Sequence, residues 1–289
     1  MSGPNVRNLA LSHRLRRWIM PLACALLGTA SLAAESTAQP NVSLLGPPLS
    51  MPGLNRSRSI RLYLPPGYAG AAVTKRYPVI YMHDGQNLFD AATAYAGEWN
   101  VDETLNALSR STGFEAIVVG IDNGGDKRMS ELSPSINPHV GEAQGKAYLD
   151  FVVDVVKPLI DSRYRTLPDR DNTAMIGSSM GGLISHAALI WYPSVFGRAA
   201  LFSTAYESAG DFLDSVLSES LAPGTRIYLY AGGTESEHMV PETRRAAAAF
   251  LRQLPAKDVA LSIVQANRHN EAAWRAEFER AVRWLFAIH

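Results

Sequence analysis

The chain has 289 residues, of which 47% are hydrophobic, and its 27 basic and 27 acidic side chains give a formal net charge of zero. No basic stripe of the kind that binds nucleic acid is present, and the sequence shows no internal repeat. This length and hydrophobic content fit one α/β domain with a single large core.

The N-terminal segment has the pattern of a secretory signal peptide. Three arginines come just before the apolar run 18–27, and small residues follow it. The run is shorter than the roughly 18 residues that a membrane span needs and contains Pro21, which disfavours a permanent anchor. We therefore predict that residues 1–38 are a signal peptide cleaved after Ala33 or Ala38. The mature protein is then periplasmic or secreted, with no stable membrane association.

The mature part of the chain would contain no disulfide, because Cys24 is the single cysteine and lies inside the apolar run. Positions 1–38 hold four Arg and one Glu, which leaves 23 basic and 26 acidic residues after cleavage. Residues 39–55 are rich in Pro, Ser and Gly and are predicted to form a flexible lead over the surface. Residues 56–289 are predicted to form a single domain.

From residue 59 onward, short β-rich runs alternate with longer amphipathic runs. The predicted strands are 59–64, 79–82, 116–121, 173–176, 199–202, 227–230 and 261–264. The predicted helices are 101–109, 145–160, 179–191, 210–218, 242–254 and 271–287. This alternation predicts a doubly wound α/β fold with a mostly parallel sheet, helices on both faces and an antiparallel strand at the N-terminal edge. Ligands of such sheets bind beyond the carboxyl ends of the strands.

The run Gly177–Gly182 joins a predicted strand to a predicted helix and has Ser179 at the turn between them. A G-x-S-x-G pattern in this context is typical of a nucleophile elbow, in which small neighbours let the serine hydroxyl project above the sheet at a helix N-terminus. Outside this context, the same cluster would indicate only a flexible turn. Ser179 is therefore the predicted nucleophile.

A serine hydroxyl is a weak nucleophile at neutral pH, so it needs a base within hydrogen-bond reach and a third group that orients the base. His269 follows the last predicted strand, and Glu235 lies in the loop after the strand before it. The chain order serine, acid, histidine is that of α/β hydrolases. His139 and His238 are alternative bases, and Glu237 is an alternative acid.

An acyl-transfer site also needs hydrogen-bond donors for the developing oxyanion. The backbone N–H of Met180, which follows the candidate nucleophile, is one predicted donor, and Gln86, in the loop after strand 79–82, is the second.

Further polar and aromatic residues lie beyond the predicted strand ends, where substrate would bind. For Asp84 the alternative is a place in an ordinary turn. For Trp99 the alternative is a hydrophobic staple that precedes an N-cap at Asp102. Arg128 would bind a substrate carboxylate or phenolate, or pair with Glu131 or Asp126. The predicted substrate-binding residues are Asp84, Trp99, Asn123 and Arg128.

Four separated motifs carry a family resemblance: Tyr81–Phe89, Gly120–Asn123 with Arg128 and Glu131, Gly177–Gly182, and His269–Trp274. With these motifs in order, the chain resembles the putative esterase family of α/β hydrolases, also called the esterase D-like family, over roughly 56–285. That family includes enterobactin and salmochelin esterases, feruloyl and acetylxylan esterases and mycolyltransferases. The resemblance implies an α/β-hydrolase fold, Ser179 as nucleophile, His269 as base and an oxyanion hole that includes the loop 84–87. Some siderophore esterases of the family resemble a Ser/His dyad, which leaves the contribution of Glu235 open.

The sequence therefore predicts an exported serine esterase that forms an acyl-enzyme on Ser179 and requires no metal or cofactor. Its expected substrate is a small-molecule or glycan ester of the siderophore, feruloyl or acetyl type, and no nucleic-acid partner is expected. Two alternatives remain: an acyltransferase of the same fold, and a non-catalytic binding module on a hydrolase scaffold.

Overall fold

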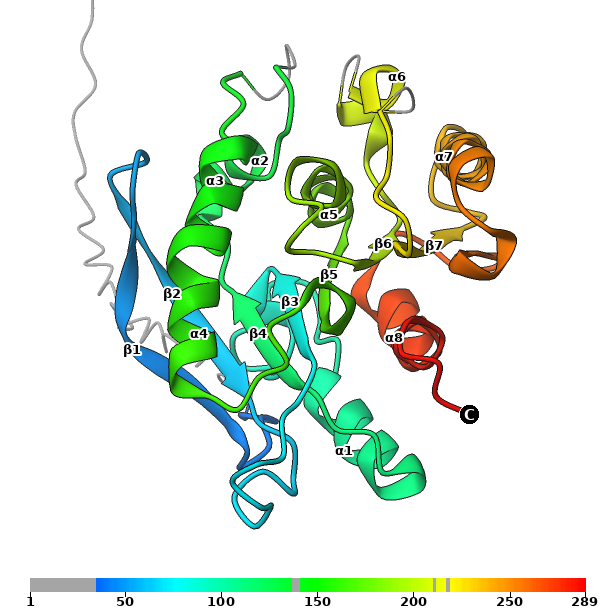
Figure 1. Ribbon diagram of the computed structural model, residues 1–289. Helices are drawn as coiled ribbons and strands as arrows, with labels where there is room; N and C mark the ends of the chain where they lie inside the picture. Colours follow the sequence, from blue (N-terminus) through cyan, green and yellow to red (C-terminus); the bar gives the residue numbers. More distant parts are fainter. Residues whose placement is uncertain (1–34, 137–140, 210–211, 217–218) are drawn as a thin grey trace, which may run out of the picture. The chain divides into compact units, whose positions relative to one another are not determined.

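The computed structural model describes residues 35–136, 141–209, 212–216 and 219–289 (Figure 1). Residues 34–289 form one compact unit. The predicted signal peptide lies almost entirely outside the described residues, and so does the alternative base His139. Within the described ranges, no helix is both long and apolar enough to cross a membrane.

Eight strands form one sheet in the spatial order β1-β2-β4-β3-β5-β6-β7-β8. β1 pairs antiparallel with β2 and β2 pairs antiparallel with β4, whereas all the other pairs are parallel. This topology confirms the predicted mostly parallel α/β sheet with an antiparallel N-terminal edge. The strands are β1 (Val42–Met51), β2 (Arg56–Tyr63), β3 (Val79–His83), β4 (Ile117–Ile121), β5 (Thr173–Ser178), β6 (Arg198–Phe202), β7 (Arg226–Gly232) and β8 (Val259–Val264).

Helices cover both faces of the sheet (Figure 1). The longer helices on one face are α3, α4, α5 and α7, and those on the other are α1 and α8. A π-helical segment, Val152–Val156, joins α3 to α4 without a break. The helices are α1 (Val101–Thr112), α2 (Arg128–Glu131), α3 (Gly145–Phe151), α4 (Lys157–Arg163), α5 (Met180–Trp191), α6 (Phe212–Val216), α7 (Met239–Gln253) and α8 (Glu271–Leu285).

The central strands are mostly apolar because both of their faces are covered. Every residue of β3 is buried, with Tyr81 packed in the core of the α3–α5 side and Ile80 and Met82 packed in the core of the α1–α8 side. Since successive side chains of a strand point to opposite faces, a strand buried on both faces has a continuous apolar run instead of an alternating one.

The structure corrects the prediction of a flexible lead over 39–55, because Val42–Met51 is an edge strand paired with β2. Pro47 and Pro48 interrupt the strand pattern in the sequence, and the pairing register shifts between Leu45 and Leu49, around these two prolines. An edge strand with an irregular register tolerates proline, because a missing N–H there removes no central ladder bond. The other predicted elements are present, with ends displaced by at most three residues, and the short helix α2 was not predicted.

The strand order determines where the site lies. From β3 the chain continues to β4 on one side and later to β5 on the other, so the winding direction changes between β3 and β5. Loops diverge at such a switch point and leave a crevice beyond the carboxyl ends of the strands. Residues that follow His83 and Ser178 therefore face a common opening.

Candidate active site

Ser179 stands at the sharp turn between β5 and α5, with φ 57° and ψ −120°. A non-glycine residue in this sparsely populated region is strained and persists only where its surroundings hold it. The Ser179 N–H donates to the carbonyl of Phe202 at 2.9 Å, and the Ser179 carbonyl accepts from the N–H of Ala205 at 3.2 Å. A Cβ on Gly177 would lie 2.6 Å from the carbonyl carbon and oxygen of Gly181. The tight turn thus depends on glycine, as the sequence pattern predicted.

His269, in the loop after β8, is paired with Glu235, in the loop after β7. The His269 Nδ1 and Glu235 Oε2 atoms are 2.7 Å apart. The other oxygen, Oε1, accepts hydrogen bonds from the Ser203 hydroxyl at 2.7 Å and from the Gly232 N–H at 2.6 Å. The Glu235 side chain is 1% exposed and that of His269 is 37% exposed. A fixed, buried carboxylate therefore orients an accessible imidazole.

The alternative acid and one alternative base lie elsewhere. The Glu237 side chain is 88% exposed and contacts only His238 among the ion pairs of the described residues, at 3.4 Å. Neither residue lines a cavity that Ser179 lines. The carboxylate beside His269 is thus that of Glu235.

Ser179 and His269 line the same two neighbouring cavities, of about 470 Å³ and 200 Å³. Met180 and Glu235 line the smaller cavity. Three further residues of the larger cavity, which are not among the predicted substrate-binding residues, are Tyr95, Glu271 and Trp274. The larger cavity brings together these sequence-predicted residues: Asp84, Gln86, Trp99, Asn123, Arg128, Ser179 and His269.

Arg128 pairs with Asp84, which corrects both predicted partners. Its Nε and Nη2 atoms donate to Asp84 Oδ1 at 2.6 Å and Oδ2 at 2.8 Å. Asn123 Nδ2 also donates to Asp84 Oδ1, at 2.6 Å. Glu131 instead pairs with Arg58, and the ion pair of Asp126 is with the adjacent lysine. Sequence proximity favoured the wrong partners, because the β3 loop and α2 meet only in the folded sheet.

The Asp84 carboxylate is buried, and besides its place in a turn it forms the ion pair with Arg128. Burial alone would raise the pKa of Asp84, but the hydrogen bonds and charge of Arg128 lower this pKa below its ordinary value. Asp84 itself has φ 56° and begins the 3₁₀ turn Gly85–Asn87. The ion pair therefore holds the loop that follows β3 against the wall of the larger cavity.

The two residues predicted as oxyanion donors border the cavities at Ser179, Gln86 the larger one and Met180 the smaller one. Gln86 and Met180 are in the first turns of the 3₁₀ turn Gly85–Asn87 and of α5, where backbone N–H groups lack an intrahelical partner. The side-chain Oε1 of Gln86 accepts from the backbone N–H of Asn123 at 3.0 Å, which orients the side-chain amide but does not occupy its NH₂ group. Gln86 therefore offers its backbone N–H and its side-chain NH₂ group as donors.

Trp99 lines the larger cavity and packs against Trp274, with ring centroids 5.7 Å apart. The structure does not support the predicted N-cap role of Asp102, because Asn100 is the N-cap residue of α1. Asp102 instead accepts from the backbone N–H of Gln39 through Oδ2 at 2.8 Å.

Sequence reasoning missed Ser203, which follows β6. This residue is fully buried and has φ 44°, and its hydroxyl oxygen accepts from Trp274 Nε1 at 2.9 Å while donating to Glu235. Trp274 in turn packs edge-on against His269, with centroids 5.0 Å apart. The position of Ser203 after a strand end is the only signal for it in the sequence, since Ser203 belongs to none of the recognised motifs.

The sequence profile of the family described as "Putative esterase" matches residues 52–285, which is most of the chain. This chain belongs to the Putative esterase family. The match confirms the predicted resemblance, and the protein is an ester hydrolase.

This esterase is similar to the uncharacterized protein YbbA of Bacillus subtilis (strain 168), with 28% identity over 248 residues that cover 80% of this chain and 93% of that protein. It is also similar to an endo-1,4-beta-xylanase/feruloyl esterase of Xylanibacter ruminicola, with 23% identity over 80% of this chain and 30% of that protein. Among solved structures, the enterobactin esterase FES of Shigella flexneri matches with a TM-score of 0.69 and 20% identity, over 87% of this chain and 60% of that chain. At this identity the structural likeness shows a shared fold.

Proposed function

We propose that this esterase is an exported serine carboxylic ester hydrolase that acts through an acyl-enzyme on Ser179. One observation carries the proposal: His269 and the strained Ser179 border the same two cavities, and Glu235 pairs with His269 at 2.7 Å. The signal-peptide pattern in residues 1–38 supports export.

In the proposed reaction, Ser179 Oγ attacks the ester carbonyl carbon while His269 Nε2 takes the hydroxyl proton. The Nδ1–H of the resulting imidazolium donates to Glu235 Oε2, which holds the ring and stabilises its positive charge. The backbone N–H groups of Met180 and Gln86 stabilise the tetrahedral oxyanion. Its collapse expels the alcohol with the proton from His269 and leaves the acyl-enzyme. His269 then activates a water molecule, which releases the acid and restores Ser179.

The lining of the larger cavity supports an ester with an aromatic acyl group as substrate. Tyr95, Trp99 and Trp274 offer ring surfaces, and Asn123 and Arg128 supply polar groups on the same cavity. Aromatic side chains bind planar rings by stacked or edge-on contact. The feruloyl esterase and enterobactin esterase names of the similar proteins support phenolic esters over acetyl esters.

The test compares the wild type with Ser179→Ala and His269→Ala, using a fluorophosphonate probe, a p-nitrophenyl ester and methyl ferulate. We expect Ser179→Ala to lose all labelling, and both variants to lose at least about 10³-fold in kcat, because serine and histidine act as one unit. Thermal unfolding checks that both variants are folded. A folded wild type that is not labelled, or a Ser179→Ala protein that still turns over ester, would overturn the mechanism.

A further inference from the structure

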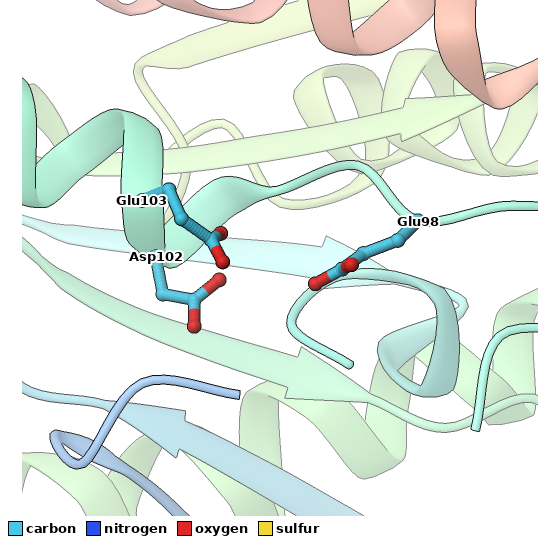
Figure 2. A group of neighbouring side chains, drawn as sticks. All are labelled: Glu98, Asp102 and Glu103. Atoms are coloured by element: carbon cyan, nitrogen blue, oxygen red, sulfur yellow. The ribbon is translucent and has the colours of Figure 1, made fainter. Parts of the chain in front are cut away.

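Three carboxylates gather where the chain enters α1, outside both cavities of the candidate active site. Asp102 and Glu103 belong to the first turn of α1, and Glu98 comes from the preceding loop. One oxygen from each carboxylate lies within 4.8 Å of the other two. Figure 2 shows the side chains of Asp102 and Glu103 on the helix and the carboxylate of Glu98 reaching toward them from the loop.

Each of these carboxylates has one oxygen that the protein binds. The segment just before β1 supplies the donors: Thr37 Oγ1 donates to Glu98 Oε2 at 2.8 Å, and the Gln39 N–H donates to Asp102 Oδ2 at 2.8 Å. Gln39 Nε2 donates to Glu103 Oε1 at 3.3 Å. Thr37 and Gln39 thus lie over the cluster and are held by it, which agrees with signal cleavage after Ala33 but not after Ala38, because cleavage after Ala38 would remove Thr37.

The second oxygen of each carboxylate has no hydrogen-bond partner among the described residues and is shielded from solvent. These atoms are Glu98 Oε1, Asp102 Oδ1 and Glu103 Oε2. Glu98 is 6% exposed and Asp102 is 0% exposed. A buried acceptor without a partner costs free energy, and such a group in a native structure indicates a bound ion or water.

No basic side chain neutralises the cluster in the described part of the chain, since none of the ion pairs there involves these three residues. The guanidinium of Arg275 is nearby, but it donates to the backbone carbonyl of Glu98 and to the side chain of Asn100. Three carboxylates with one free oxygen each therefore lack an ion-pair partner among the described residues.

We propose that Glu98, Asp102 and Glu103 bind a hard divalent cation, Ca²⁺, which fastens the N-terminal segment onto α1. Ca²⁺ prefers carboxylate and other oxygen ligands at about 2.3–2.6 Å, so two oxygens bound to one ion lie at most about 5 Å apart. The separation of up to 4.8 Å between the carboxylate oxygens meets this limit. The ion takes no part in the ester chemistry, because the cluster does not line the cavities at Ser179.

A retained proton is the competing way to neutralise the cluster. Burial and the adjacent Glu103 carboxylate raise the pKa of Asp102 to about 8, and burial raises the pKa of Glu98. Binding is therefore measured at pH 9, where proton retention by Asp102 does not hide it.

The experiment treats the full chain with EDTA, removes the chelator, and titrates CaCl₂ by isothermal calorimetry and thermal unfolding. We expect a Kd of about 10⁻⁴ to 10⁻³ M, and a rise in Tm of about 5 °C at 10 mM Ca²⁺. Asp102→Asn should abolish the binding heat and the Tm shift. The variant should still fold, because the asparagine oxygen can accept from the Gln39 N–H.

Glu103→Gln is a second variant with the same expected loss, and Glu237→Gln, at an exposed carboxylate elsewhere, is the control that should keep the full shift. No binding heat and no Tm shift in the wild type at pH 9 would overturn the proposal. An undiminished Ca²⁺ shift in both cluster variants would also overturn it, because the ion would then bind elsewhere.

Discussion

Replacing Glu235 by Gln exchanges one oxygen for an NH₂ group, and we expect it to remove most of the esterase activity. Oε1 of Glu235 accepts from the Gly232 N–H at 2.6 Å and from the Ser203 hydroxyl at 2.7 Å. The amide oxygen of Gln must occupy this position, because an NH₂ group there would face the Gly232 N–H donor to donor. The NH₂ group then points at His269 Nδ1.

This orientation forces the wrong histidine tautomer. An NH₂ group donates to Nδ1, so the imidazole proton moves to Nε2, and His269 can no longer take the Ser179 proton there. The corresponding change in a serine protease triad lowers kcat by about 10⁴-fold. Since Glu235 is nearly inaccessible to water, at 1% side-chain exposure, solvent gives little relief. We therefore expect kcat for a p-nitrophenyl ester to fall by about 10³- to 10⁴-fold.

Glu237→Gln provides the matched control, two residues away on an exposed side chain, and it should keep kcat within about twofold of the wild type. Thermal unfolding should show that both variants are folded. A Glu235→Gln protein that retains more than about a tenth of the wild-type kcat would refute this reasoning, and would indicate that Ser179 and His269 act as a dyad.

Two further predictions concern stability. Gly177→Ala should lower the free energy of unfolding by about 1–3 kcal/mol, because the new Cβ would lie 2.6 Å from the Gly181 backbone; an unchanged urea midpoint would contradict this. Burial lowers the pKa of His186 in the folded protein from 6.5 to about 3. As the pH falls below 6.5, the unfolded chain therefore binds a proton at this residue before the folded protein does, and stability is lost between pH 6.5 and about 3. Between pH 6 and 4, wild-type stability should fall about 1.4 kcal/mol per pH unit more steeply than that of His186→Phe; equal slopes would refute the assignment.

Most of the fold, together with the Ser179 turn, could be predicted from the sequence, because these features depend on neighbouring residues. Apolar runs of strand and helix length define the sheet and its helices, and the glycines that flank Ser179 define the elbow whose strained φ of 57° the structure contains. His269 could be selected because it follows the last strand, and the carboxyl ends of parallel strands share one edge. Edge strand β1 was not predicted, because Pro47 and Pro48 interrupt the strand-like pattern of its sequence.

The pairing of side chains from distant segments was decided only by the tertiary structure. The sequence favoured Glu235 but left Glu237 open as the acid, and only the approach of the loops after β7 and β8 gives Glu235 the 2.7 Å contact with His269. Arg128 pairs with Asp84, 44 residues away, instead of an acid near it in the sequence. Residues 37–39 likewise meet the carboxylates at the start of α1 only in the fold. Such contacts depend on loop conformation and long-range packing, which have no local periodicity, whereas strands, helices and turns depend on the residues within them.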